Sequence, residues 1–290
     1  MALTTPPGPL SRRTGDTNYT VDGPAHRILL TPTDKRVRVL VGDGAGGRRT
    51  VVDTTRALLL HETGLLPRYY VPVEDVDADL LLDSDTSTHC PFKGDATYAH
   101  VRAGERTAPD LVWFYRDPVA TMPALAGLAG LYLEHLDLLP ADARPDGEGA
   151  EPLDVVLEEE QPVLGHPRDP YHRVDAWPSS RHVVVTWEPQ GRDPVVLAET
   201  SHPVGLFETG FPARWYVPAD DVRDDLLESS PTRTVCPYKG VADHRSVAGG
   251  PADVAWRYRD PLPEASAVAG LTCFLGDDVV TTVDGERLTA

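Results

Sequence analysis

A short motif in the order Thr-x-Cys-Pro-aromatic-Lys-Gly occurs twice in the chain, at residues 88–94 and 234–240. Its cysteines, Cys90 and Cys236, each stand three positions before a lysine on a tight, proline-containing loop. A nearby ammonium and backbone N–H groups favour the thiolate, which is the nucleophilic form of cysteine. Free cysteines are more often small buried hydrophobic residues, so a structural role stays open beside that of a catalytic nucleophile.

The lysines of the motif, Lys93 and Lys239, directly precede its glycine. A lysine in this position can bind an anionic ligand, while the glycine allows the backbone to approach closely. The alternatives are a solvated lysine, or one paired with an acid such as Asp75 or Asp221. The fixed spacing in both copies makes an anion site as well supported as these alternatives.

Arginine and aromatic residues accompany the motif at a distance. Arg68 lies two positions before Tyr70, so on a strand both side chains would share a face. Tyr70 and Tyr115 can line a ligand cleft with a polar tip exposed, whereas Trp113 is better suited to core packing. An Arg–Tyr pair beside Lys93 would suit a carboxylate or a phosphate. The same residue types recur at Arg214, Tyr216, Trp256 and Tyr258.

Two acidic positions also recur. Asp75 and Asp221 precede apolar residues with helical spacing, which favours N-capping of a short helix, with a general-base role as the alternative. Glu62 and Glu208 stand at expected strand ends, where a carboxylate either accepts hydrogen bonds in the turn or faces a pocket. The sequence does not separate these two roles.

All these recurrences follow one internal repeat. An offset of 146 positions places Cys90 on Cys236 and His26 on His172 without a gap. Residues 62–96 and 208–242 share 20 identities in 35 positions, where unrelated sequences would share about two. The neighbours of the two histidines indicate the entry to a strand rather than a site. A repeat of this length predicts a repeated fold.

The repeat predicts the domain organisation. We expect a loose N-terminal tail at residues 1–25, a first domain at 26–138, a linker at 139–171 and a second domain at 172–290. The linker is rich in proline, glycine and acidic residues, which is typical of an exposed connection. Two homologous domains can pack about a pseudo-twofold axis, so intramolecular pairing of the domains is expected.

Composition excludes several classes of function. The chain carries 45 acidic and 27 basic residues, a net charge of -18, which would repel nucleic acid and anionic membrane surfaces. No apolar run suits a membrane span or a signal peptide, so a cytoplasmic protein is expected. Three scattered cysteines and the lack of zinc-type spacings predict neither a disulfide framework nor a metal site, and no cofactor is indicated.

Short β-branched runs predict the fold class. Residues 37–41 and 183–187 are each followed by a turn region and a second apolar run, near 50–53 in the first copy, which favours a hairpin. Short helices are expected after Asp75 and Asp221 and at 122–128 and 264–270, with last strands at 131–138 and 272–283. The prediction is a mainly β protein of two small antiparallel domains, each with one or two short helices.

Four motifs in the same order carry a family resemblance. They are Glu-Thr-Gly, Tyr-Val-Pro-x-x-Asp-Val, Thr-x-Cys-Pro-aromatic-Lys-Gly and Trp-x-Tyr-Arg-Asp-Pro. Together they resemble the DUF427 family over residues 26–138 and 172–290. The resemblance implies a compact, mainly antiparallel β domain without an established reaction. A nucleotidyltransferase-like label for the family would require paired carboxylates for Mg²⁺, but Asp-Ser-Asp at 83–85 becomes Ser-Ser-Pro at 229–231.

The leading hypothesis is that each domain binds a small anionic ligand in a polar-aromatic pocket. Two alternatives stay open: an enzyme that uses Cys90 and Cys236 as nucleophiles, and a structural or partner-binding module. The predicted ligand-binding residues are Arg68, Tyr70, Asp75, Lys93 and Tyr115 beside Cys90, and Arg214, Tyr216, Asp221, Lys239 and Tyr258 beside Cys236.

Overall fold

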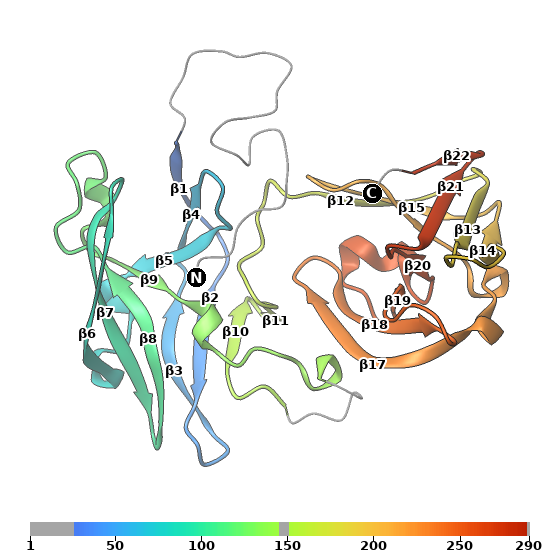
Figure 1. Cartoon of the computed structure of the whole chain (residues 1–290). Coiled ribbons are helices and arrows are strands. Elements are labelled where there is room, and N and C mark those ends of the chain that lie inside the picture. Colours follow the sequence, from blue (N-terminus) through green and yellow to red (C-terminus); the bar gives the residue numbers. More distant parts are fainter. Residues whose placement is uncertain (1–25, 145–150, 289–290) are drawn as a thin grey trace. The chain divides into compact units, whose positions relative to one another are not determined.

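The computed structural model describes residues 26–144 and 151–288, which form two compact units (Figure 1). The first unit comprises residues 26–139 and 151–169, and the second comprises residues 140–144 and 170–288. Both consist of antiparallel sheets, which confirms the prediction of two small, mainly β domains. The expected N-terminal tail lies outside the described residues. No helix in the described ranges is long and apolar enough to cross a membrane.

The first unit contains two sheets. The larger has the order β1 (Ile28–Pro32), β4 (Leu58–Glu62), β5 (Arg68–Pro72), β9 (Leu128–Leu131), β8 (Arg106–Phe114), β7 (Gly94–Ala103) and β6 (Leu81–Cys90). The smaller has the order β11 (Gln161–Pro162), β10 (Val155–Glu158), β2 (Val37–Gly42) and β3 (Arg48–Thr54). The predicted hairpin is confirmed, because β2 pairs antiparallel with β3.

The second unit repeats this plan with shorter strands. Its three sheets are β12 (Val174–Pro178), β15 (Val204–Glu208) and β16 (Arg214–Tyr216); β14 (Val195–Thr200), β13 (Val183–Trp187), β21 (Val279–Val283) and β22 (Glu286–Arg287); and β17 (Leu227–Cys236), β18 (Gly240–Val247), β19 (Ala255–Tyr258) and β20 (Cys273–Phe274). A single bridge between Val217 and Thr272 joins the first and third of these, as β5 joins β9 in the first unit.

Side-chain alternation along the strands creates two cores in the first unit. Successive residues of a strand point to opposite faces, so Tyr69 and Tyr70 of β5 enter different cores. Tyr69 packs with valines of β2 and β3 between the two sheets. Tyr70 packs with Trp113, Tyr115 and Leu125 on the opposite face, which we call the aromatic core. The predicted site residues are distributed between these two faces.

The expected short helices are 3₁₀ helices of one or two turns. Those nearest the predicted positions are Val73–Asp75, Ala78–Leu80 and Pro123–Leu125 in the first unit, and Ala219–Asp221, Asp224–Leu226 and Pro263–Val268 in the second. The prediction that Asp75 and Asp221 are N-caps is wrong, because each is the last residue of its turn and a proline precedes the turn. In the first unit, the apolar residues that suggested one helix are Val76 directly after this turn, Leu80 in the next 3₁₀ turn and Leu81 at the start of β6.

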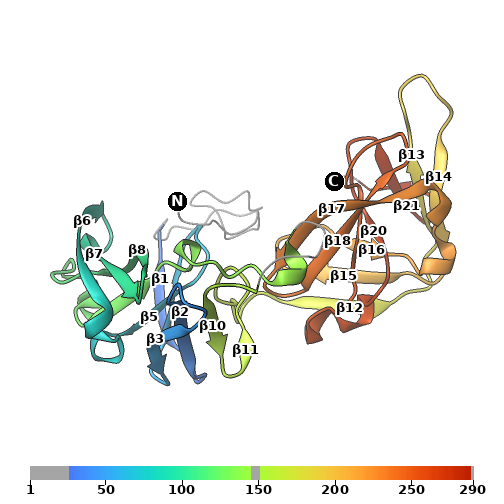
Figure 2. The same ribbon diagram turned by 90° about the horizontal axis from the view of Figure 1, so that it is seen from below.

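The segment expected to be an exposed linker completes the first unit instead. Strands β10 and β11 form a hairpin, and β10 pairs with β2 (Figure 2). In the second unit β21 and β22 form the corresponding hairpin, and β21 pairs with β13. Glu158 lies opposite Val37 in the first unit, and Val283 lies opposite the matched Val183 in the second. The acid-rich composition of residues 139–171 concealed a strand of only four residues. The predicted last strand at 131–138 is wrong, since β9 ends at Leu131 and a 3₁₀ turn follows at Leu133–His135.

One mismatch in the repeat has a steric reason. Gly130 corresponds to Cys273, and a Cβ atom at Gly130 would lie 2.2 Å from the Trp113 ring. Glycine therefore makes room for a tryptophan that is almost fully buried, whereas the matched Trp256 of the second unit is partly exposed. Cys273 packs with Tyr216 and Tyr258.

Candidate functional site

The Cys-Pro-aromatic-Lys-Gly segment is the tight turn between β6 and β7. Cys90 is the last residue of β6 and pairs with Gly94, the first residue of β7, while Lys93 N–H donates to the Cys90 carbonyl at 3.2 Å. Gly94 has φ = +106°, a backbone conformation that favours glycine over residues with a Cβ atom. The second unit repeats the turn, with Gly240 at φ = +99°.

The turn places its lysine in a buried cluster with a glutamate and a histidine. Lys93 Nζ donates to Glu62 Oε2, and the other carboxylate oxygen accepts from His26 Nε2 at 2.9 Å. The imidazole ring stacks on Phe92 of the turn, with ring centroids 3.7 Å apart. Only 6% of the Glu62 side chain and 10% of the Lys93 side chain are exposed. We call these three residues the His–Glu–Lys cluster.

The second unit contains the same cluster, built from His172, Glu208 and Lys239. Lys239 Nζ donates to Glu208 Oε2, and His172 Nε2 is 3.0 Å from Glu208 Oε1. His172 stacks on Tyr238 at 4.1 Å. Burial alone would raise the pKa of Glu208, but the hydrogen bond from His172 and the charge of Lys239 outweigh burial and lower this pKa below its ordinary value. The carboxylate therefore stays ionised at neutral pH.

Buried tyrosines lie beside each cluster. In the first unit Trp113 Nε1 donates to the Tyr70 hydroxyl at 3.0 Å, and in the second Trp256 Nε1 donates to Tyr216 at 3.2 Å. Burial raises the pKa of Tyr70 far above its ordinary value, and the negative charge of Glu62 adds to this effect. The hydroxyl is therefore held neutral. Burial likewise raises the pKa values of Tyr115, Tyr216 and Tyr258.

The three cysteines fall into two classes. Cys90 and Cys236 are partly buried, and Cys90 packs against the aromatic core. Cys273 is fully buried, and burial raises the pKa of its thiol to about 12. Cys90 and Cys236, unlike Cys273, are therefore partly open to solvent.

Two of the predicted site residues have other partners. Arg68 forms an ion pair with Glu134, and its guanidinium lies 5.5 Å from the centre of the Tyr132 ring. It shares the aromatic face with Tyr70, but its charge is already paired.

Asp75 lies elsewhere. It accepts hydrogen bonds from Thr54 at the end of β3 and from Arg56. Asp221 occupies the matched place in the second unit, since Val222 bridges Ala198 as Val76 bridges Val52. Including Asp75 and Asp221 in the predicted pocket was therefore wrong. Each lies next to a residue that bridges to β3 in the first unit or to β14 in the second.

Two cluster residues in each unit were not placed in the predicted site. The Glu62 carboxylate contacts the side chains of His26 and Lys93, a role that neither alternative for this residue included. His26 stands at the entry to β1, as expected, and its ring also contacts both the turn and the glutamate. The available signal was the repeat itself, which preserves His, Glu and Lys at one offset of 146 positions.

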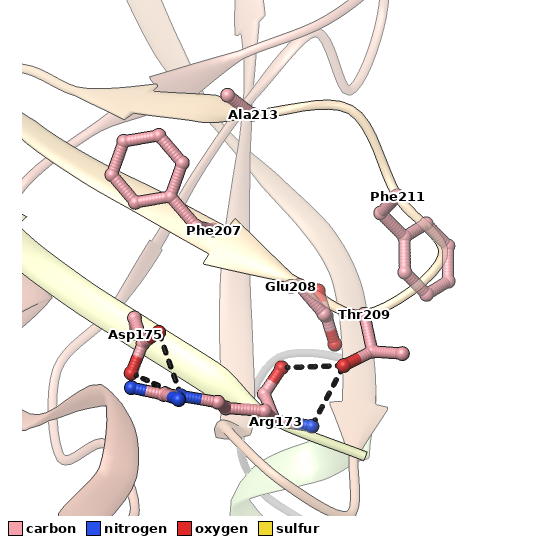
Figure 3. Close-up of a pocket in the computed structure, with 7 residues that line it drawn as sticks. All are labelled: Arg173, Asp175, Phe207, Glu208, Thr209, Phe211 and Ala213. Atoms are coloured by element: carbon pink, nitrogen blue, oxygen red, sulfur yellow. Dashed lines mark hydrogen bonds and ion pairs between the residues drawn. The ribbon is translucent and has the colours of Figure 1, made fainter. Parts of the chain in front are cut away.

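Two pockets open near these residues. One of about 220 Å³ is lined by Glu208 together with Arg173, Phe207 and Phe211 (Figure 3). The other, of about 290 Å³, lies in the first unit and is lined by Tyr115 with Phe114, Arg116 and residues 126–128. Neither lining includes a cysteine or lysine of the repeated turns. The described residues contain no group of three or more His, Cys, Asp or Glu side chains arranged to hold a metal ion.

Comparison with known proteins bears on the whole domain. The sequence model of a family described as a domain of unknown function, DUF427, matches residues 29–141 and 175–285. No curated protein matches the chain. The two matched regions contain both turns and both His–Glu–Lys clusters, apart from the histidines, which precede each region. The chain belongs to the DUF427 family and carries two copies of its domain.

Proposed function

We propose that each domain binds a small anionic molecule at its His–Glu–Lys cluster. The observation that carries this proposal is the presence of one buried, charged cluster in both domains, with the same atoms in contact. The cysteine of the turn and the buried tyrosines would form the walls of the site. Lys93 and Lys239 belong to the turns after β6 and β17, so ligand binding would require each turn to shift and separate the lysine from its glutamate.

Energetics favour a function over a purely structural role. A buried ion pair is often no more stabilising than apolar residues of similar size, because burying charges costs free energy. The second domain shows such replacements elsewhere, since Val279 and Val283 stand where the first domain has the buried acids Asp154 and Glu158. The His–Glu–Lys cluster has not been replaced in this way. A role in ligand binding would explain the difference.

The chemistry of the cluster indicates an anion. An ammonium has three N–H donors, and Glu62 accepts one of those of Lys93. The Nδ1 atom of His26 is buried and has no hydrogen-bond partner among the described residues. A ligand oxygen could accept from the lysine, and a ligand hydroxyl could donate to His26 Nδ1. Phosphates and hydroxy acids offer both groups. We place this activity in the cytoplasm, and the net charge of -18 argues against nucleic acid as the ligand.

Histidine resonances provide the test. The full chain would be titrated with inorganic phosphate while the imidazole signals are followed by NMR. We expect the signals of His26 and His172 to move together and to saturate at millimolar phosphate or below. His89, which is exposed and paired with Asp95, is the control and should not saturate. Shifts confined to exposed histidines, or no shifts, would contradict anion binding at the cluster.

A second candidate function is covalent chemistry at the repeated cysteines. It is favoured by the partial exposure of Cys90 and Cys236, in contrast to Cys273, which is buried. In the native chain, iodoacetamide should alkylate the first two at least ten times faster than the third. A rate no greater than that of the buried thiol would rule out a cysteine nucleophile. The variants C90S and C236S assign each rate to its residue.

A further inference from the structure

The second domain exposes aromatic side chains on one face of its β12–β15 pair. Trp177, Phe207 and Phe211 are 57%, 44% and 43% exposed, and we call them the aromatic face. Trp177 on β12 lies opposite Gly205 on β15. Gly205 is two positions before Phe207 and shares its face of the strand, so the rings of Trp177 and Phe207 project from the same side of the pair. Figure 3 shows Phe207 on β15 and Phe211 on the following turn, lining one pocket of about 220 Å³.

The matched face of the first domain is covered by the chain itself. Residues 163–169 follow β11 without regular structure, and Val163, Leu164 and Pro167 are buried. Val163 joins the core that contains Tyr69. At the end of the segment, Asp169 Oδ1 lies 3.7 Å from Nδ1 of His61, the residue that corresponds to Phe207. A short proline-containing segment is therefore the cover for this surface.

The second domain lacks this cover among its described residues. Leu288 corresponds to Val163, because their backbone N–H groups donate to matched carbonyls. The acceptor of Val163 is Val156 of β10, and that of Leu288 is Thr281 of β21. Val163 is only 4% exposed, whereas Leu288 is 41% exposed. No described residue of the second domain corresponds to 164–169. The buried Nε1 of Trp215 has no acceptor in the described structure, although the matched Tyr69 hydroxyl donates to Glu158.

Substitutions make the uncovered surface more apolar than the covered one. Phe207 and Trp177 replace His61 and Thr31 at the matched positions. The one exposed cation of the pocket, Arg173, is paired with Asp175 (Figure 3). The surface therefore offers aromatic rings and no free charge for a ligand to neutralise. Proline rings pack well on such rings and lose little conformational entropy on binding.

We propose that the aromatic face of the second domain is a docking site for an irregular, proline-containing peptide segment of a partner protein. The segment would resemble residues 163–169, with an apolar side chain in place of Asp169 because Phe207 stands where His61 would pair with it. The pocket that Phe207 and Phe211 line also includes Glu208 of the His–Glu–Lys cluster. The docking site uses the exposed aromatic rings and not the charges of the cluster, so the proposal does not depend on the ligand proposed above.

A synthetic peptide tests the docking site. Its sequence is that of residues 160–171 with the change D169L, and its binding to the full chain would be measured by fluorescence anisotropy. We expect a dissociation constant below about 1 mM, and at least tenfold weaker binding to W177A and to F207A. L29A, which removes an exposed apolar side chain of the first domain, is the control and should bind like the parent chain.

The peptide that retains Asp169 provides the specificity test. It should bind at least threefold more weakly than the D169L peptide, because its carboxylate would meet an aromatic ring. Absence of binding at 1 mM peptide, or equal binding by W177A and F207A, would overturn the proposal. Both substituted side chains are exposed, and circular dichroism of each variant would confirm that it folds.

Discussion

Replacing Asp154 by alanine should lower the free energy of unfolding of the first domain by about 3–5 kcal/mol. The side chain is fully buried and accepts from the backbone N–H of Gly42 at 2.9 Å and of Asp137 at 2.8 Å. It also pairs with both terminal nitrogens of Arg106. Removing the carboxylate leaves a cation and two N–H groups without acceptors. The hairpin of β10 and β11 would then detach from β2.

Hydrogen exchange can measure this loss in one domain. The amides of Val39 and Val156 report on β2 and β10, and their protection should fall together in D154A. D53A is the matched control, because Asp53 forms an exposed pair with Arg36 and its loss should cost no more than about 1 kcal/mol. Unchanged protection of β2 in D154A would show that the hairpin is not part of the domain.

The effect of D154A should depend on pH. Burial alone would raise the pKa of Asp154, but the hydrogen bonds from Arg106 and from the two backbone N–H groups outweigh burial and lower it below the ordinary value of 3.8. A carboxyl whose pKa is lowered by folding stabilises the native state above its unfolded pKa. That stabilisation is lost as pH falls through the lower, folded pKa. The difference in unfolding free energy between the parent chain and D154A should therefore be constant near neutral pH and should shrink in acid.

Replacing Glu62 by alanine should have an effect of similar size, about 3–5 kcal/mol. The substitution leaves the Lys93 ammonium buried without its carboxylate and removes the acceptor of His26. The same contacts tie the start of β1 and the end of β4 to the turn between β6 and β7, which is not adjacent to them in the sheet. The turn should therefore lose hydrogen-exchange protection first.

The repeat supplies a matched control for this variant. E208A removes the corresponding carboxylate of the second domain and should destabilise that domain by a similar amount. Each substitution should leave the other domain unaffected, which hydrogen exchange can resolve. A loss below about 1 kcal/mol in both variants would place these pairs among ordinary surface ion pairs, contrary to their burial.

Local sequence patterns predicted the parts of the fold that local physics determines. The β2–β3 hairpin follows from two β-branched runs around a glycine-rich turn. The turn at residues 88–94 follows from proline and from a glycine with positive φ. The repeat then predicted that both features would recur in the second domain, as they do.

Long-range contacts determined what the sequence did not reveal. Glu62 and Lys93 are 31 positions apart and lie on elements that are not neighbours in the sheet, so no periodicity connects them. The apolar spacing after Asp75 resembles that of a helix, but Asp75 ends one 3₁₀ turn and a second turn, Ala78–Leu80, leads directly into β6. The four-residue β10 was hidden because acidic residues surround it. Asp154, directly before β10, is fully buried, contrary to the usual rule that acids mark exposed segments.

The central claim is that the His–Glu–Lys cluster serves a ligand rather than the stability of the domain. The double variant E62Q/K93M tests it most directly, because it removes both charges and keeps an acceptor for His26. Its stability and its phosphate binding would be measured together by hydrogen exchange and by calorimetric titration. We expect a change in unfolding free energy of no more than about 1 kcal/mol and a fall from two phosphate sites per chain to one. Two sites retained at full affinity would contradict the claim.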